Sequence, residues 1–179
     1  MFDMFNQQED SDSQENQESE YNSNSNVSSG DTFVLSIGGS LLVKAKPDSE
    51  MIQKISEAIS ELHSAGKKIV LVVGGGKTAR NYVEAMVGSN NFEKDLMGIE
   101  LTRANAFLLA SQISECHKEV LTEIPKAKEI LDSGKIPVFG GLMPLFTTDA
   151  VGALLAEFLE ATFVNLTNVD GVYNVDPKD

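Results

Sequence analysis

The chain has 179 residues, with 27 acidic and 14 basic side chains and a formal net charge of −13. No apolar run approaches the ~18 to 20 residues that a membrane-spanning helix requires, so a membrane protein is excluded. The single cysteine, Cys116, excludes an intramolecular disulfide and is compatible with a reducing cytosol, so we expect a cytoplasmic location.

Most of the excess negative charge lies in the first 32 residues, which hold eight acids and no Lys or Arg. Their Ser, Asn and Gln cannot bury enough surface to offset the entropy of ordering, so residues 1–32 are predicted to be a disordered acidic tail. The segment resembles neither a secretory signal nor a mitochondrial presequence. Residues 33–179 keep 14 bases and 19 acids, a balance that predicts one globular domain and argues against non-specific nucleic-acid binding.

After the tail, short apolar runs alternate with amphipathic segments. Strands are predicted at 33–37, 68–73, 136–139 and 162–166, with a further short strand at 120–122. Helices are predicted at 48–65, 78–87, 98–115, 125–133 and 148–159. Cys116 and His117 are expected to continue the third helical pattern as structural residues, and His63 is expected at the surface. This alternation predicts an α/β protein with a largely parallel sheet covered on both faces.

Glycines follow three of the predicted strands, at 38–39, 74–76 and 140–141. Ligands of open α/β sheets bind beyond the carboxyl ends of the strands, where these three turns would gather. Three such turns favour one long ligand or two ligands, and two phosphorylated molecules held end to end would fit.

The second turn is the most informative. The apolar run 69–73 indicates a strand buried on both faces, and it ends abruptly at Gly74-Gly75-Gly76. The helix that follows offers free N–H groups and a positive dipole end, to which Lys77 and Arg80 add full charges. We therefore predict an anion site for phosphate. Because the motif is neither GxGxxG nor a P-loop, a tight turn with solvated cations is the alternative.

Three polar groups have a functional and a purely structural interpretation. The hydroxyl and N–H groups of Thr147, Thr148 and Asp149 would donate to a second phosphate, or these residues would only cap a helix. Residues 167–177 would form a nucleotide pocket, in which Asp170 organises cations, or an ordinary polar turn. Asp95, predicted to precede the third helix, would accept hydrogen bonds from a ribose or be a loop acid.

The order of these motifs resembles the amino acid kinase superfamily, and within it the archaeal-type uridylate kinases. The matching stretches are VLSIGGSLL (34–42), VVGGGKTARNYVEA (72–85), DLMGIELTRANA (95–106) and most of 137–178. The resemblance implies a three-layer α/β/α sandwich that transfers the γ-phosphate of ATP to UMP, with Mg²⁺ as cofactor. Relatives of this type are usually hexamers.

The resemblance also implies roles for individual residues. Arg80 and Asp170 would be catalytic, by neutralising charge and by organising the reacting centre, and no residue is predicted to bind a resident metal. ATP would contact Gly39, Ser40, Leu41, Leu42, Val43, Gly76, Arg80, Thr167, Tyr173 and Asp176. UMP would contact Gly75, Asp95, Leu142, Met143, Pro144, Leu145, Phe146, Thr147 and Thr148.

Three features depart from the superfamily pattern. Ser36 stands where many members carry Lys, a residue that the archaeal-type subgroup also lacks. The 142–146 segment is unusually apolar, and relatives continue beyond the position of Asp179, so the domain is expected to lack its C-terminal part. The alternatives are a kinase of the same fold for isopentenyl phosphate or acetylglutamate, and a non-catalytic nucleotide-binding or storage protein. The absence of His shortly after the second glycine turn and the pattern at 95–106 favour the nucleotide acceptor.

Overall fold

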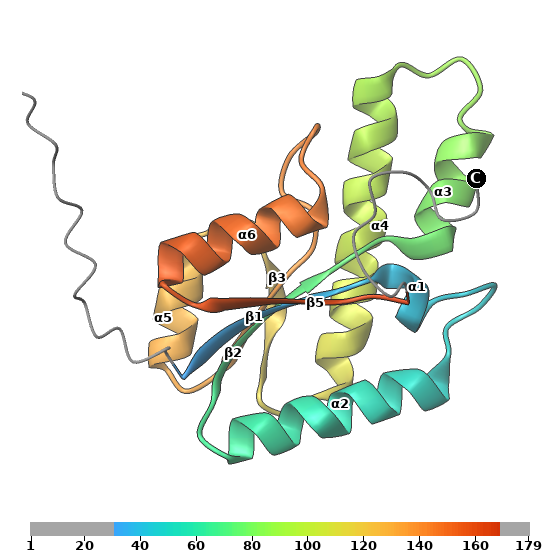
Figure 1. Cartoon of the computed structure of the whole chain (residues 1–179). Coiled ribbons are helices and arrows are strands. Elements are labelled where there is room, and N and C mark those ends of the chain that lie inside the picture. The colour runs from blue at the N-terminus through green and yellow to red at the C-terminus, as the bar shows by residue number, and fades with distance from the viewer. Residues whose placement is uncertain (1–30, 169–179) are drawn as a thin grey trace, which may run out of the picture.

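The computed structural model describes residues 31–168 and contains a five-stranded sheet (Figure 1). All neighbouring strands are parallel, in the order β3-β4-β2-β1-β5. The strands are β1 (Thr32–Ile37), β2 (Lys68–Val73), β3 (Cys116–Leu121), β4 (Ile136–Phe139) and β5 (Thr162–Leu166). The parallel sheet confirms the prediction drawn from the alternation of strands and helices.

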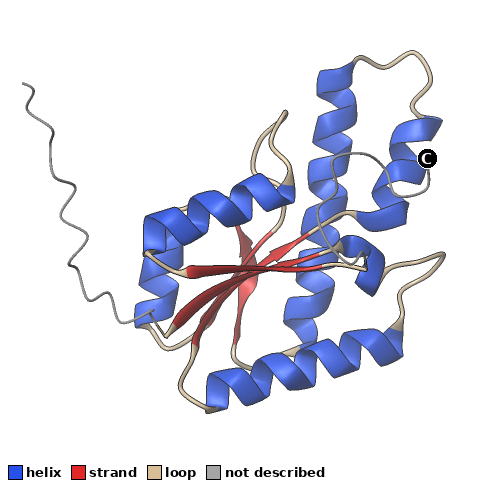
Figure 2. Ribbon diagram, viewed as in Figure 1, coloured by secondary structure: helices blue, strands red, loops and turns tan. Residues whose placement is uncertain are grey.

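Helices cover both faces of the sheet and complete the predicted three-layer sandwich (Figure 2). One face is covered by α2 (Ser49–Ser64) and α4 (Asn91–Gln112), and the other by α5 (Lys126–Asp132) and α6 (Thr148–Leu159). Two further helices, α1 (Gly39–Leu42) and α3 (Gly76–Ala85), begin directly after β1 and β2. Both therefore start at the carboxyl edge of the sheet.

The apolar run of β2 is explained by its central place in the sheet. Ile69, Leu71 and Val73 pack towards α2 and α4, whereas Val70 and Val72 pack towards α5 and α6. Each of these five side chains is at most 1% exposed. A central parallel strand covered on both faces needs apolar residues at successive positions, so the run shows no alternation.

Helix α4 begins at Asn91, seven positions before the predicted start at Gly98. Its N-terminus is fixed by a capping box, in which Asn90 Oδ1 accepts from Glu93 N and Glu93 Oε2 accepts from Asn90 N. The prediction that Asp95 precedes this helix is therefore wrong, because Asp95 lies on its second turn. The Asn-x-x-Glu pattern was the sequence signal for the earlier start.

Cys116 and His117 lie on β3, so their predicted place in a helical pattern is wrong, and the strand is longer than the predicted 120–122. The helix ends at Gln112 because Ile113 is extended, and Lys118 Nζ donates to the oxygens of Ala110 and Ile113. Apolar spacing continued past this end and concealed it. Burial raises the pKa of the Cys116 thiol to about 12, so the thiol is neutral and unreactive in the folded protein.

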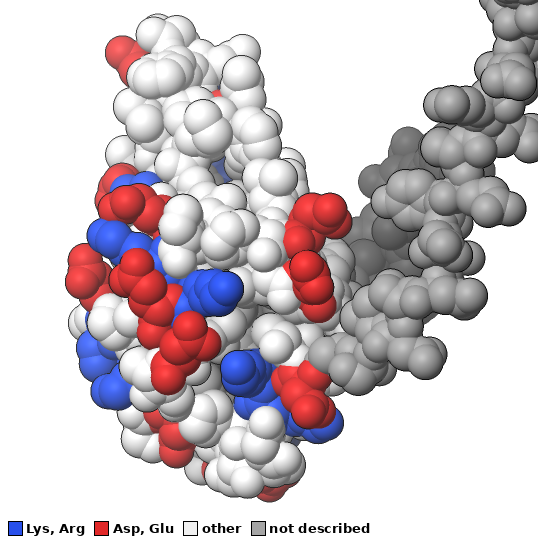
Figure 3. All heavy atoms as spheres, turned by 90° about the vertical axis from the view of Figure 1, so that its left-hand side faces the viewer, with Lys and Arg blue, Asp and Glu red and all other residues white. Residues whose placement is uncertain are grey.

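The start of β1 lies inside the segment assigned to the acidic tail. Thr32 pairs with Lys68, and Asp31 Oδ1 contacts Lys67 Nζ at 2.7 Å, while residues 1–30 lie outside the described part of the chain. On the face that Figure 3 shows, basic and acidic side chains are interspersed. None of the helices within residues 31–168 has the length and hydropathy needed to cross a membrane.

Candidate active site

The first two glycine turns touch at the carboxyl edge of the sheet. A Cβ atom on Gly39 would overlap the oxygen of Gly74 and the nitrogen of Gly76, so only glycine allows this approach. Gly76 has φ +63°, and a Cβ atom there would lie 2.5 Å from the carbonyl carbon of Gly39. The two turns thus form one compact backbone surface at the starts of α1 and α3.

The second turn carries unused hydrogen-bond donors. Within the described residues, the N–H groups of Gly75, Gly76, Lys77 and Thr78 have no protein acceptor, and the first intrahelical bond runs from Ala79 N to Gly75 O. Lys77 and Arg80 are exposed on the first turns of α3. Free donors, a positive helix end and two cations make this turn chemically suited to a phosphate group.

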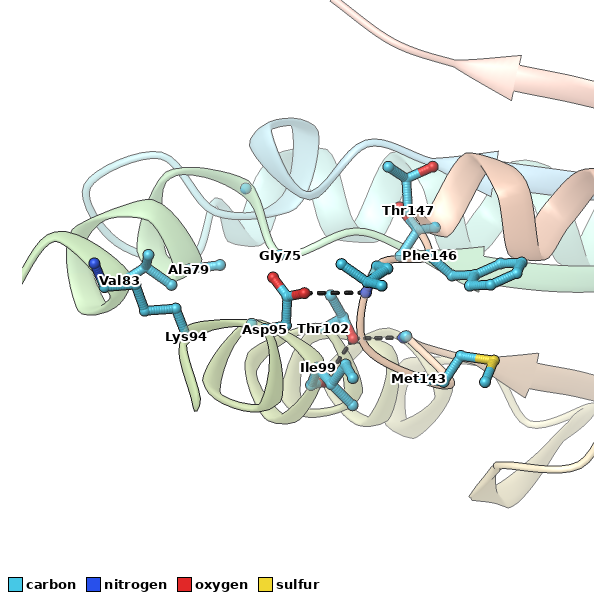
Figure 4. Close-up of a pocket in the computed structure, with 15 residues that line it drawn as sticks. Gly75, Ala79, Val83, Lys94, Asp95, Ile99, Thr102, Met143, Phe146 and Thr147 are labelled. Atoms are coloured by element: carbon cyan, nitrogen blue, oxygen red, sulfur yellow. Dashed lines mark hydrogen bonds between the residues drawn. The ribbon is translucent and has the colours of Figure 1, made fainter. Parts of the chain in front are cut away.

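A cavity of about 490 Å³ lies between this turn, α4 and the segment that leads into α6 (Figure 4). Its wall includes seven of the nine residues predicted to contact UMP, and only Leu142 and Pro144 of that set do not line it. The seven are Gly75, Asp95, Met143, Leu145, Phe146, Thr147 and Thr148. The remaining wall consists of Gly76, Ala79, Val83, Lys94, Gly98, Ile99, Thr102 and Gly141. Gly76 was predicted to contact ATP and Gly141 to belong to the third glycine turn, whereas Ala79 and Val83 of α3 and Lys94 of α4 had no predicted role.

Helix α4 holds the third glycine turn in place. Thr102 is 8% exposed, and its Oγ1 donates to Ile99 O and accepts from Gly141 N, both at 2.6 Å (Figure 4). Arg103 Nε donates to Gly141 O at 3.2 Å. Thr102 and Arg103, which lie within the 95–106 pattern that favoured the nucleotide acceptor, therefore act on the backbone of this turn.

Asp95 is bonded to the protein itself. Its Oδ2 accepts from Leu145 N at 3.0 Å, across the cavity from α4 to the 142–147 segment (Figure 4). Leu145 is 91% exposed and has φ +71°, a conformation that costs a non-glycine residue about 1–2 kcal/mol. The carboxylate of Asp95 thus holds a strained loop residue.

A second long-range contact lies where α6 begins. Ser36 is 2% exposed, and its Oγ donates to Asp149 Oδ1 at 2.7 Å. Thr147 is the N-cap of α6, with Oγ1 accepting from Ala150 N at 3.1 Å, as the capping interpretation expected. Thr148 Oγ1 lies near Gly74, since a Cβ atom on that glycine would be 3.5 Å away. The start of α6 is therefore close to the first two glycine turns.

The residues predicted to bind ATP fall into three groups. The first group, Gly39, Ser40 and Gly76, lies at the touching turns, with Arg80 one turn further along α3. The buried Leu42 and Val43 pack in the core, so they could reach a nucleotide only through their backbone. Leu41 is partly buried against the same core, and Thr167 is exposed just after β5. Tyr173 and Asp176 lie outside the described residues, as does Asp170, which was predicted to be catalytic. Within 31–168, no group of three or more His, Cys, Asp or Glu side chains could hold a metal ion.

The chain belongs to the amino acid kinase family, whose sequence profile matches residues 31–179. It is 49% identical over 150 residues to the uridylate kinase of Pyrococcus abyssi, an alignment that covers 82% of this chain and 66% of that protein. The chain thus spans about two thirds of the length of such curated relatives.

Solved structures agree with the fold. The crystal structure of the Archaeoglobus fulgidus uridylate kinase matches with a TM-score of 0.74 and 42% identity, over 82% of this chain and 68% of that one. The UMP kinase of Bacillus anthracis matches with a TM-score of 0.69 at 21% identity, over 83% of this chain and 69% of that one. At that lower identity, the likeness concerns the fold alone.

Proposed function

We propose that the protein is a UMP kinase, which transfers the γ-phosphate of ATP to UMP to give UDP in pyrimidine nucleotide biosynthesis. The observation that carries the proposal is the shared cavity, because the glycine turn suited to phosphate and the segment assigned to UMP line the same wall. Its supports are the motif order and the 49% identity, over 150 residues, to a protein named uridylate kinase. The acceptor would lie between α4 and the 142–148 segment, with its phosphate towards Gly75.

Phosphoryl transfer of this kind requires positioning and charge neutralisation, without a covalent intermediate. The free N–H groups of residues 75–78 would hold phosphate oxygens, and Arg80 would neutralise charge that develops on the transferred group. Asp170 would organise the reacting centre. Mg²⁺ would enter bound to the ATP phosphates, since it needs only one or two protein carboxylates, and Asp149 stands at this edge.

The proposal extends to a hexameric assembly and a cytoplasmic location. The first rests on the resemblance to hexameric relatives, and the second on a composition with a single buried cysteine. Kinases of the same fold for isopentenyl phosphate or acetylglutamate, and a non-catalytic nucleotide-binding protein, are not favoured by the names of the similar relatives.

The test is a coupled assay of ADP release with Mg²⁺-ATP and equal concentrations of UMP, CMP or AMP. A site that reads the uracil edge by hydrogen bonds should give UMP a kcat/KM about tenfold higher than either competitor. ADP release without an acceptor provides the baseline. Equal or faster turnover of AMP would show that the acceptor is assigned wrongly.

A further inference from the structure

Asn105 lies on α4, one turn beyond the residues that hold the third glycine turn, and its side chain reaches the second. Its Nδ2 donates to Gly74 O at 2.9 Å and to Gly75 O at 3.2 Å, from a residue that is 8% exposed. Two carbonyl oxygens can be bonded only by the NH₂ end of the amide, so the orientation of the side chain is fixed. Asn105 does not line the cavity of the proposed site.

The consequence follows from peptide geometry. No peptide bond in the described chain is cis, so each C=O points opposite to the N–H of the next residue. Drawing the oxygens of Gly74 and Gly75 towards α4 directs the N–H groups of Gly75 and Gly76 away from α4. These are two of the donors that have no protein acceptor within the described residues.

The two peptides depend on Asn105 to different degrees. Gly75 O also accepts from Ala79 N at 3.3 Å, whereas Asn105 provides the hydrogen bond recorded for Gly74 O within residues 31–168. The peptide that carries the Gly75 N–H is therefore the more dependent of the two, and Gly75 lies on the cavity wall.

We infer that Asn105 is a positioning residue for phosphate binding: it aims the N–H groups of Gly75 and Gly76 at the anion without touching it. This inference deepens the proposed function and rests on its phosphate site. Asn105 acts on the second glycine turn as Thr102 acts on the third, so one helix sets the distance between the two turns.

The experiment is a titration of the ¹⁵N-labelled full chain with inorganic tripolyphosphate, followed through the amide signals of Gly75 and Gly76. In the unaltered protein both signals should shift and saturate. Asn105→Leu removes both donors without adding charge, and misdirecting an N–H from a charged acceptor should weaken binding about 10- to 100-fold. Asn105→Ser keeps one hydroxyl donor in a smaller side chain, so it should fall between the two and serves if Asn105→Leu does not fold.

The matched control is Leu109→Ala, which removes a fully buried side chain one turn further along α4 and lowers stability without touching the glycine turn. Its Kd for tripolyphosphate should stay within about twofold of the unaltered value, well short of a tenfold change, which corresponds to ~1.4 kcal/mol of binding free energy. The inference is overturned if the two amides do not shift, if the Asn105 variants bind normally, or if Leu109→Ala weakens binding as much as Asn105→Leu. An expected titration without UMP-dependent ADP release would support the role of Asn105 while refuting the UMP kinase assignment.

Discussion

The second and third glycine turns end neighbouring strands of the same sheet, yet they are built differently. At Gly74–Gly76 the backbone lies against Gly39, Asn105 bonds two of its carbonyl oxygens, and the N–H groups of Gly75 and Gly76 have no acceptor among residues 31–168. At Gly140–Gly141 the N–H of Gly141 is already used by Thr102. The second turn therefore has N–H donors free for a ligand, whereas the N–H of Gly141 in the third turn is already bonded within the protein.

The chain beyond each turn differs as well. A helix begins at Gly76 itself, whereas six loop residues follow Gly141, among them the exposed Met143, Leu145 and Phe146. That loop is held by Asp95 at Leu145, a residue with positive φ. The contrast teaches that, in the proposed function, fixed backbone would meet the phosphate group, which is the same in every nucleotide, whereas a loop with few attachments would meet the variable part of the acceptor.

The largest expected effect comes from breaking the rigid turn with Gly76→Ala. A Cβ atom there would stand 2.5 Å from the carbonyl carbon of Gly39 and would force a non-glycine residue to φ +63°. Strain and overpacking together should lower the free energy of unfolding by about 2–5 kcal/mol, measured by urea denaturation. The control is Gly134→Ala, with φ +76° and open space around it, which should cost only the ~1–2 kcal/mol of strain. Equal losses would mean that the close approach to Gly39 contributes nothing.

The next effect concerns charge at the rigid turn. If the exposed Arg80 contacts phosphate and that contact strengthens in the transition state, Arg80→Ala should lower kcat with ATP and UMP about 10- to 100-fold. Lys128→Ala removes an exposed cation from α5, on the opposite layer, and should leave the rate unchanged. Steady-state kinetics measure both variants. Unchanged kcat and unchanged KM for ATP in Arg80→Ala would remove the charge-neutralising role.

The smallest expected effect tests how Asp95 holds the loop of residues 142–147. Asp95→Ala removes the acceptor of the Leu145 N–H, so exchange of that amide with solvent should accelerate about tenfold, as a lost hydrogen bond of about 1.4 kcal/mol implies. Global stability should change by less than about 1 kcal/mol, because the contact is exposed. Asp132→Ala on α5 is the charge-matched control, and hydrogen exchange reports on both variants. An unchanged exchange rate at Leu145 would show that Asp95 does not hold the loop.

Much of the fold was predictable because it depends on local patterns. The continuous apolar run of β2 predicts a parallel sheet, and the glycines after three strands indicate its carboxyl edge. The errors have local causes too. Helix α4 starts before the predicted position because the capping box at Asn90 and Glu93 lies ahead of the apolar pattern, and β3 is longer than predicted because apolar spacing runs on past Gln112 without a Gly or Pro.

The candidate site was less predictable, since its supports are distant in sequence. Thr102 and Gly141 are 39 positions apart, and Asn105 and Gly74 are 31 apart, so no local pattern connects them. The resemblance included Thr102 and Asn105 within a matching stretch but gave neither of them its backbone partner. Likewise, Ser36 gained a partner only when the fold brought Asp149 beside it.

The place of β1 in the sheet also has a consequence for how the protein is made. One edge of β1 pairs with β2, but the other pairs with β5, with Phe33 opposite Thr162. As the chain leaves the ribosome from its N-terminus, β1 must therefore keep this edge unsatisfied until β5 is made, after all the other elements that the structure describes. Because β1 and β5 are far apart in the sequence, their pairing is expected to be slow, and it leaves a β-rich segment open to wrong partners during that time. Production of this protein should accordingly depend on protection of the nascent chain as well as on the stability of the finished sheet.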